Sequence, residues 1–269
     1  MNLDNLFLSP LEMSKAISDI GEKKASARIF ELFAFGVLAG MYIAFGSSVA
    51  TAVLSGGTLD TGVAKFLAGS VFSVGLILVL ISGSELFTGN ILMTTGFIYR
   101  KYSFFKVLRN WLVVYFANLL GATIIAWLVF KSGLLARLGD LTPMGAVAVK
   151  ITEAKLQLSF TEALCRGVLC NMLVCLAVIM CVASRTVEGK ILGIYFPIMT
   201  FVASGYEHSV ANMYFLPAGL MAKGEFASRF FTMFNNLIPV TIGNIIGGLL
   251  IVLLHPKAVE KIDRILRKK

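Results

Sequence analysis

Two polar stretches interrupt apolar segments of this chain, and both carry side chains that can hold an anion or transfer a proton. The longer stretch, ASGYEHSVANM at 203–213, lies within the apolar segment Ile191–Leu216. The shorter, SGSELFTG at 82–89, repeats its Ser-Gly-x-Glu and downstream Asn 122 residues earlier. Because backbone groups in hydrocarbon must be hydrogen-bonded within the protein, polar clusters at membrane depth predict broken helices around an enclosed cavity. Paired interruptions of this kind indicate a transport site.

His208 is the residue with the most versatile chemistry in these stretches. A histidine gains or loses a proton near neutral pH. In a narrow apolar pore it would donate that proton to the anion of a weak acid or hold the anion by its charge. The alternative is a structural histidine that only satisfies neighbouring backbone carbonyls. We favour the functional interpretation, because ionisable residues within membranes usually mark a pathway.

The other polar residues of the interrupted segments have two interpretations each. Glu85 and Glu207 hold equivalent positions and either bind a cation or cap the free N–H groups at a helix break, and we favour capping. Thr88 offers a hydroxyl that is predicted to contact His208 across a pseudo-twofold axis. Asn171 and Asn244 either orient a substrate or bond neighbouring helices.

Five further residues are candidates whose type and spacing alone do not decide between pore and structure. Leu76, Leu86 and Phe201 are gate or ordinary core residues. Lys24 and Lys155 lie at opposite mouths of the predicted pathway, where they either draw anions in or are simply solvated surface lysines.

Composition places these residues in a polytopic helical membrane protein. The chain has 269 residues, of which 57% are hydrophobic and 14% charged, with a formal net charge of +9. Apolar runs of about 20 residues are long enough to span a bilayer as a helix. Such runs predict six spans, over Phe30–Leu54, Val63–Phe97, Leu108–Phe130, Ala163–Ala183, Ile191–Leu216 and Asn236–Leu254. Trp111 and Trp127 are predicted to anchor the two ends of the third span at the interfaces. We expect no cleavable signal peptide, because the first strongly apolar run begins only near Phe30.

The spans form two halves that match in order. Gly36 and Met41 align with Gly167 and Met172, and Asn110 through Gly121 aligns with Asn236 through Gly247. Three spans per half require the two repeats to be inverted in the membrane. The expected single transmembrane domain comprises an amphipathic N-terminal helix (1–28), a first repeat (29–131), a long connection with a short helix over Met144–Leu156 (132–160), a second repeat (161–255) and a basic tail (256–269). Most flanking Lys and Arg residues lie on the side of the termini, which predicts that both termini are cytoplasmic and that the connection is periplasmic.

The four cysteines are Cys165, Cys170, Cys175 and Cys181, all in one apolar segment and without metal-ligand spacing. We expect them to be reduced, small packing residues. No metal, cofactor or catalytic residue is expected.

Four motifs resemble the formate/nitrite transporter family: residues 203–213, CNMLVCLA at 170–177, ELFT at 85–88 and NLIPVTIGNIIGG at 236–248. The resemblance covers nearly the whole chain. It implies an aquaporin-like protomer of six helices, a homopentamer with one pore per protomer, and passage of small monovalent anions across the bacterial cytoplasmic membrane. It further implies that Leu76, Leu86 and Phe201 form constrictions, that His208 is central with Thr88 opposite and Glu207, Asn171 and Asn244 nearby, and that Lys24 and Lys155 lie in the vestibules.

The sequence thus predicts a channel or proton-coupled carrier rather than an enzyme, with formate as the expected anion and nitrite or hydrosulfide as alternatives. An intramembrane hydrolase using Ser and His208 is disfavoured, because no second Ser–His signature or oxyanion-type loop is present. A water or glycerol channel is disfavoured because its Asn-Pro-Ala boxes are absent.

Overall fold

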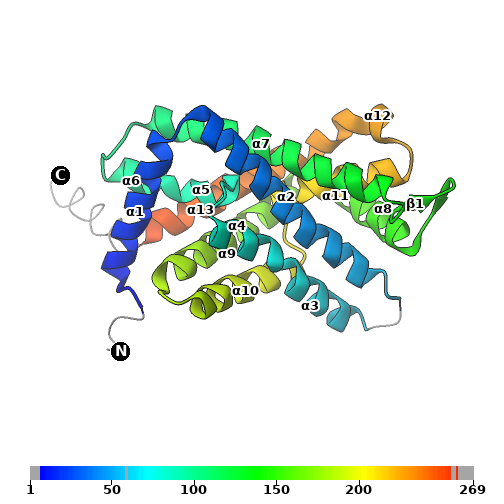
Figure 1. Ribbon diagram of the computed structural model, residues 1–269, viewed down its shortest axis with the longest axis horizontal. Coiled ribbons are helices and arrows are strands. Elements are labelled where there is room, and N and C mark those ends of the chain that lie inside the picture. The colour runs from blue at the N-terminus through cyan, green and yellow to red at the C-terminus, as the bar shows by residue number, and fades with distance from the viewer. Residues whose placement is uncertain (1–6, 58–59, 256–258, 260–269) are drawn as a thin grey trace.

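A computed structural model describes residues 7–57, 60–255 and 259 of the chain. The described part is almost entirely helical (Figure 1). Its elements are α1 (Pro10–Ser26), α2 (Ile29–Leu54), α3 (Thr61–Phe72), α4 (Val74–Ser82), α5 (Phe87–Asn90), η2 (Ile91–Met93), α6 (Thr94–Ile98), α7 (Phe104–Lys131), β1 (Ala136–Arg137), β2 (Asp140–Leu141), α8 (Pro143–Leu156), α9 (Phe160–Ala183), α10 (Val187–Ala203), α11 (Ser209–Ala222), α12 (Phe226–Arg229), η3 (Phe230–Thr232) and α13 (Met233–Leu254).

Five helical stretches are long and apolar enough to cross a membrane, which makes this a multi-pass membrane protein. They are Ile29–Leu54, Thr61–Ser82, Phe104–Lys131, Phe160–Ala183 and Phe226–Leu254. Large apolar side chains such as Phe30, Phe105 and Leu112 point outward from them, as lipid-facing residues do. The predicted fifth span, Ile191–Leu216, falls in α10 and α11, which have 17 and 14 residues and are each shorter than a single full crossing.

Glycines allow the long helices to pack closely in two pairs. A Cβ on Gly121 of α7 would lie 2.0 Å from the carbonyl oxygen of Val37 in α2. A Cβ on Gly247 of α13 would lie 2.2 Å from the carbonyl oxygen of Val168 in α9. Close backbone approach through small residues is how membrane helices associate without a hydrophobic driving force between them. These two pairs form the frame around the interrupted segments.

Helices α4 and α10 end in the same way. Gly83 and Gly205 follow them with positive φ values of 80° and 73°, which glycine adopts without a Cβ penalty. The next residue then donates its N–H back into the helix, from Ser84 to the Val79 carbonyl at 2.9 Å and from Tyr206 to the Phe201 carbonyl at 3.0 Å. These are Schellman motifs. They release the chain into two short non-helical segments, after which α5 and α11 begin at Phe87 and Ser209.

Two helices outside the long spans lie at opposite ends of the molecule, α1 at the left of Figure 1 and α8 at the right. Helix α1 begins with a capping box, in which Ser9 and Glu12 satisfy each other's backbone N–H groups. Helix α8 begins at Pro143, where the Thr142 hydroxyl accepts from Gly145 N–H at 3.0 Å. The short helix expected over Met144–Leu156 is thereby confirmed.

One interfacial assignment was wrong, and one lies outside the described residues. Trp111 was expected at the membrane interface, but it is buried and donates its indole N–H to the Asn90 carbonyl at 3.0 Å. The position of a tryptophan along a span does not determine whether its ring faces lipid or packs against another helix. Trp127 is exposed, as expected. The predicted basic tail, 256–269, lies outside the described residues except for Val259.

Candidate functional site

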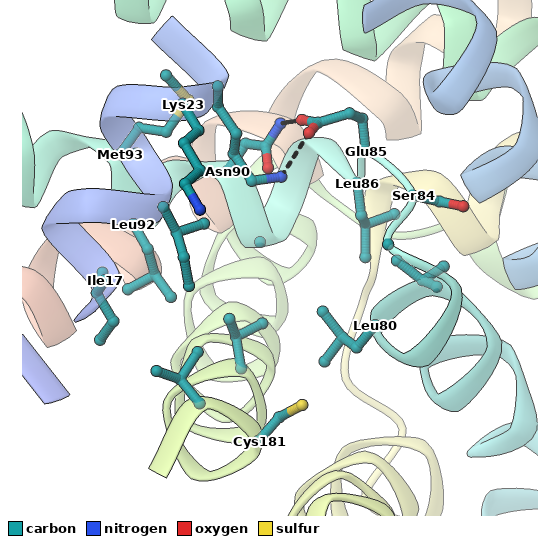
Figure 2. A pocket seen from close by; sticks show the side chains of 18 of the residues that line it. Ile17, Lys23, Leu80, Ser84, Glu85, Leu86, Asn90, Leu92, Met93 and Cys181 are labelled. Atoms are coloured by element: carbon teal, nitrogen blue, oxygen red, sulfur yellow. Dashed lines mark hydrogen bonds and ion pairs between the residues drawn. The ribbon is translucent and has the colours of Figure 1, made fainter. Parts of the chain in front are cut away.

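Two cavities of about 480 Å³ each enter the protein beside the two non-helical segments. The first cavity is lined by residues of α1, by Glu85 and Leu86, and by Cys181 at the end of α9. Figure 2 shows Glu85, Leu86 and Asn90 at its edge, with Leu80 and Cys181 farther along the wall. The second cavity is lined by residues of α3 and α8 and by Phe201, Glu207 and His208. Helices α1 and α8 lie at opposite ends of the molecule (Figure 1), and each of them lines one of the two cavities.

Glu85 lines the first cavity, and both of its carboxylate oxygens accept hydrogen bonds. Its Oε1 accepts from Lys24 Nζ at 2.7 Å, and its Oε2 accepts from Asn90 Nδ2 at 2.6 Å. The same Nδ2 also donates to Asn110 Oδ1 at 2.8 Å. Glu85 thus ties α1 to α5 and, through Asn90, to α7.

Glu207 lines the second cavity and has partners of the same residue types, a lysine and an asparagine. Lys155 Nζ donates to its Oε1 at 2.8 Å, and Asn212 Nδ2 donates to its Oε2 at 2.6 Å. Asn212 also donates to Asn236 Oδ1 at 2.7 Å. Asn236 in turn donates to the Lys155 carbonyl at 3.0 Å, which fixes the end of α8.

Lys24 and Lys155 were expected either to draw anions in or to be solvated surface lysines, and the structure shows that each is paired with a carboxylate. Both are partners of buried carboxylates, with 22% of the Lys24 side chain and 14% of the Lys155 side chain exposed. A lysine paired at this distance adds a local dipole rather than a bare positive charge. Each still borders its cavity, so the pair presents one ammonium group to whatever enters.

Two buried asparagines hold the helix breaks in place. Asn118 Oδ1 accepts from Phe87 N–H at 2.9 Å, and its Nδ2 donates to the carbonyls of Gly36 and Glu85. Asn244 Oδ1 accepts from Ser209 N–H at 2.9 Å, and its Nδ2 donates to the carbonyls of Gly167 and Glu207. These bonds satisfy backbone groups that the breaks would otherwise leave open. The Asn244 amide is thus engaged with helices.

Asn171 is bonded on one side only. Its Nδ2 donates to the carbonyls of Asn244 at 2.7 Å and Thr88 at 3.2 Å. Its Oδ1 is buried and has no hydrogen-bond partner within the described residues. An unmatched buried acceptor is uncommon in proteins.

Thr88 and His208 contact each other, and both lie at positions where the sequences of the two halves differ. His208 Nε2 lies 2.9 Å from Thr88 Oγ1, and both residues are buried. The other ring nitrogen, Nδ1, accepts from Ala211 N–H at 3.1 Å and so caps α11. At the equivalent positions the sequence has Leu86 for His208 and Val210 for Thr88. The contact therefore has no polar counterpart at the matching positions.

The three apolar residues predicted as constrictions, Leu76, Leu86 and Phe201, are all buried. Leu86 lines the first cavity, whereas Phe201 lines the second. Phe201 stacks on the His208 ring with centroids 5.8 Å apart and meets Phe72 edge to face at 5.6 Å. Leu76 is buried on α4. Leu86 therefore borders the first cavity, whereas Phe201 and His208 border the second.

Sequence reasoning did not assign the asparagine partners to the site. Asn90, Asn110, Asn118, Asn212 and Asn236 were recognised only as matches between the halves. Their matching positions in the two halves were the signal available in the sequence. A polar residue that occurs at the same place in two apolar helices is expected to have a hydrogen-bond partner in each.

Comparisons with known proteins agree on one family. A family model described as formate/nitrite transporter matches residues 11–257. A "Probable formate transporter" of Methanothermobacter thermautotrophicus is 43% identical over 263 residues, which cover 91% of this chain and 94% of that protein. The formate channel FocA of Escherichia coli K12 is 35% identical over 272 residues, covering 94% and 95%.

Solved structures give the same result. The chain matches a structure titled pentameric formate channel with formate bound, with a TM-score of 0.72 and 36% identity, covering 86% of this chain and 95% of that one. It also matches an ion channel of the same family with a TM-score of 0.81 and 28% identity, covering 91% and 96%. The chain therefore belongs to the formate/nitrite transporter family.

Proposed function

We propose that this chain moves formate across a bacterial cytoplasmic membrane through a pore that joins the two cavities. The observation that carries the proposal is the buried Thr88–His208 contact of 2.9 Å, in which His208 lines the second cavity and Thr88 lies between Leu86 and Gly89, which line the first. The formate channels among its relatives support formate as the substrate.

The proposed topology has six spans in two inverted repeats, with α3–α6 and α10–α11 as the broken spans. The paired geometry supports it: Lys24, Glu85 and Asn90 have the same contacts as Lys155, Glu207 and Asn212. With six spans both termini lie on one side, and the excess of basic residues there assigns that side to the cytoplasm. The first cavity then faces the cytoplasm and the second the periplasm, in an aquaporin-like arrangement.

In this proposal the buried side chains of Leu86 and Phe201 form an apolar barrier between the cavities. The barrier makes the passage of a bare anion costly, because a charge without water or hydrogen bonds is strongly disfavoured in such surroundings. Thr88 lowers that cost in this proposal. Its hydroxyl oxygen accepts from His208, so its own hydrogen is free to donate to a carboxylate oxygen. Ammonium groups at Lys24 and Lys155 favour the anion in each cavity before it reaches the barrier.

His208 supplies the proton coupling. Because Nδ1 accepts the Ala211 N–H, the neutral ring carries its proton on Nε2, which donates to Thr88. A second proton must go to Nδ1 and therefore displaces the Ala211 N–H. Protonation thus breaks the cap of α11 at the same moment as it places a positive charge in the barrier. The charged ring either holds formate or gives up its proton so that formic acid crosses.

Transport into liposomes tests the proposal. Wild-type protein should take up formate faster than it takes up nitrite or hydrosulfide. Thr88→Val removes the hydroxyl at nearly constant shape and should slow formate uptake by about tenfold, the value of one good hydrogen bond. Thr241→Val is the matched control, because the Thr241 hydroxyl bonds Tyr115 at 3.0 Å and Thr241 lines neither cavity. Equal uptake by wild type and Thr88→Val would contradict the assigned pore, and a preference for nitrite or hydrosulfide would reassign the substrate.

We also propose a pentamer with one pore in each protomer, on the likeness to a pentameric channel. The small and aromatic residues on the outer face of α7, including Phe116 and Trp127, suit lateral packing. Native mass spectrometry in mild detergent should give the mass of five chains. Only monomers or dimers would contradict this assembly.

A further inference from the structure

Two clusters of ion pairs hold α1 and α8 outside the spans, and each cluster lies next to one of the cavity lysines. The first cluster consists of Lys101 with Asp19 and Glu22. The second cluster consists of Glu153 and Glu225 with Lys223 and Arg229. Neither cluster lines the pore proposed above.

The second cluster binds α8 to the chain that follows α11. Glu153 of α8 accepts from Arg229 through both carboxylate oxygens, at 2.6 and 3.2 Å, and from Lys223 at 3.1 Å. Arg229 and Lys223 are in turn bridged by Glu225. A bidentate arginine within a network has a better-defined geometry than an isolated surface pair.

The first cluster binds α1 in the corresponding way. Lys101, in the loop after α6, contacts Asp19 and also Glu22, the latter at 3.2 Å. The end of α1 is fixed as well, because Arg109 Nη2 donates to the carbonyls of Ala25 and Ala27 at 3.0 Å. Glu22 stands two residues before Lys24, and Glu153 stands two residues before Lys155.

That spacing has a geometric consequence. At 3.6 residues per turn, two residues separated by two positions lie about 200° apart around a helix. Glu153 and Lys155 therefore project from nearly opposite sides of α8, one toward the cluster and one toward Glu207. A rotation of α8 about its axis would move both side chains together. Fixing Glu153 consequently fixes where the Lys155 ammonium lies in the second cavity.

We propose that the two clusters are positioning devices for the cavity lysines: Glu153 with Arg229 and Lys223 sets Lys155 against Glu207, and Glu22 with Lys101 sets Lys24 against Glu85. The effect on transport rests on the function proposed above, whereas the effect on lysine position does not. Glu22 and Glu153 act through their helices and contact no substrate.

Chemical labelling of lysine amines, read by mass spectrometry on the assembled protein, tests the position directly. In wild type both Lys24 and Lys155 should react slowly, because their Nζ atoms are bonded to buried carboxylates. Glu153→Gln should raise the labelling of Lys155 and leave Lys24 unchanged, and Glu22→Gln should do the reverse. Glu31→Gln is the matched control, since Glu31 pairs with Arg28 and belongs to neither cluster. Unchanged Lys155 labelling in Glu153→Gln, or equal increases at both lysines, would overturn the proposal.

Formate uptake then shows whether position matters for transport. Residues that share a network are coupled, and residues without shared partners act independently. Glu153→Gln should slow uptake by at least about twofold, the smallest coupling typical of such networks. Adding it to Lys155→Gln should produce no further loss, whereas adding it to Lys24→Gln should multiply the two losses. If the double variant Glu153→Gln/Lys155→Gln showed the product of the two single losses of uptake, Glu153 would act only on stability, and the proposal would be overturned. Wild-type protein that labels as expected but carries no formate would overturn the proposed function instead.

Discussion

The Thr88 hydroxyl lies 2.9 Å from Nε2 of His208, while the other nitrogen of the same ring accepts the backbone N–H of Ala211 at 3.1 Å. The imidazole therefore has two roles, as a polar group in the barrier and as the N-terminal cap of α11. Both nitrogens are engaged: the lone pair of Nδ1 accepts a hydrogen bond, so the proton of the neutral ring lies on Nε2. This arrangement fixes which tautomer the neutral ring adopts.

The first prediction concerns that tautomer. Nitrogen-15 NMR of histidine-labelled protein should show a His208 ring protonated on Nε2 and unprotonated on Nδ1 at neutral pH. The chain has two histidines, so His255→Gln leaves His208 as the only signal. His255 bonds Ser14 at 2.6 Å at the far end of α13 and does not touch the barrier. A ring protonated on Nδ1 would contradict the capping role.

The second prediction concerns the turn that ends α10. Gly205 has φ of 73° and no atom within 4 Å of an added Cβ, so only backbone strain opposes a side chain there. Gly205→Ala should lower the unfolding free energy by about 1 kcal/mol, the cost of a left-handed conformation for a residue with a Cβ. Gly205→Asn should cost less, because asparagine tolerates that conformation. Thermal unfolding in detergent measures both, and equal losses would mean that the positive φ is not the cause.

Local signals of this type were readable from sequence. The two Ser-Gly-x-Glu interruptions depend on neighbours a few residues away, and they predicted the ends of α4 and α10. The partners of Glu85 and Glu207 were not readable. Lys24 and Lys155 lie 61 and 52 residues away in sequence, and a charged residue on an amphipathic helix shows its partner only when the helix is docked. The interfacial position predicted for Trp111 was wrong for the same reason, since the hydrogen-bond partner of its indole is a carbonyl on another helix.

The third prediction concerns the stability supplied by Glu153. Hydrogen bonds from Arg229 and then Lys223 lower the pKa of the Glu153 carboxyl from its ordinary 4.5 to about 2. Folding favours the ionised form, so the stabilisation is fully present above pH 4.5 and is lost as the pH falls toward about 2. The difference in Tm between wild type and Glu153→Gln should therefore be constant near neutral pH and shrink below pH 4.5.

Glu162 provides the reference for that measurement. Its carboxylate is held by Ser159 in a capping box rather than by a cation. Glu162→Gln retains a side chain that is able to accept the same capping bond. The Tm difference of this variant should be smaller at neutral pH. A Tm difference for Glu153→Gln that does not change with pH would contradict the ion-pair account of the second cluster.

The most direct test of the account is the pH dependence of formate uptake by wild type and His208→Asn. Asparagine is a good N-cap, so the variant can retain the bond to Ala211 N–H and should fold and assemble, which native mass spectrometry checks. It cannot titrate. Wild-type uptake in liposomes should change with pH, because the His208 ring is able to gain and lose a proton. The variant should lose that dependence, and its uptake under an inward proton gradient should fall most. An assembled His208→Asn protein with the pH profile of wild type would contradict the assignment of His208 as the proton-coupling residue of the pore.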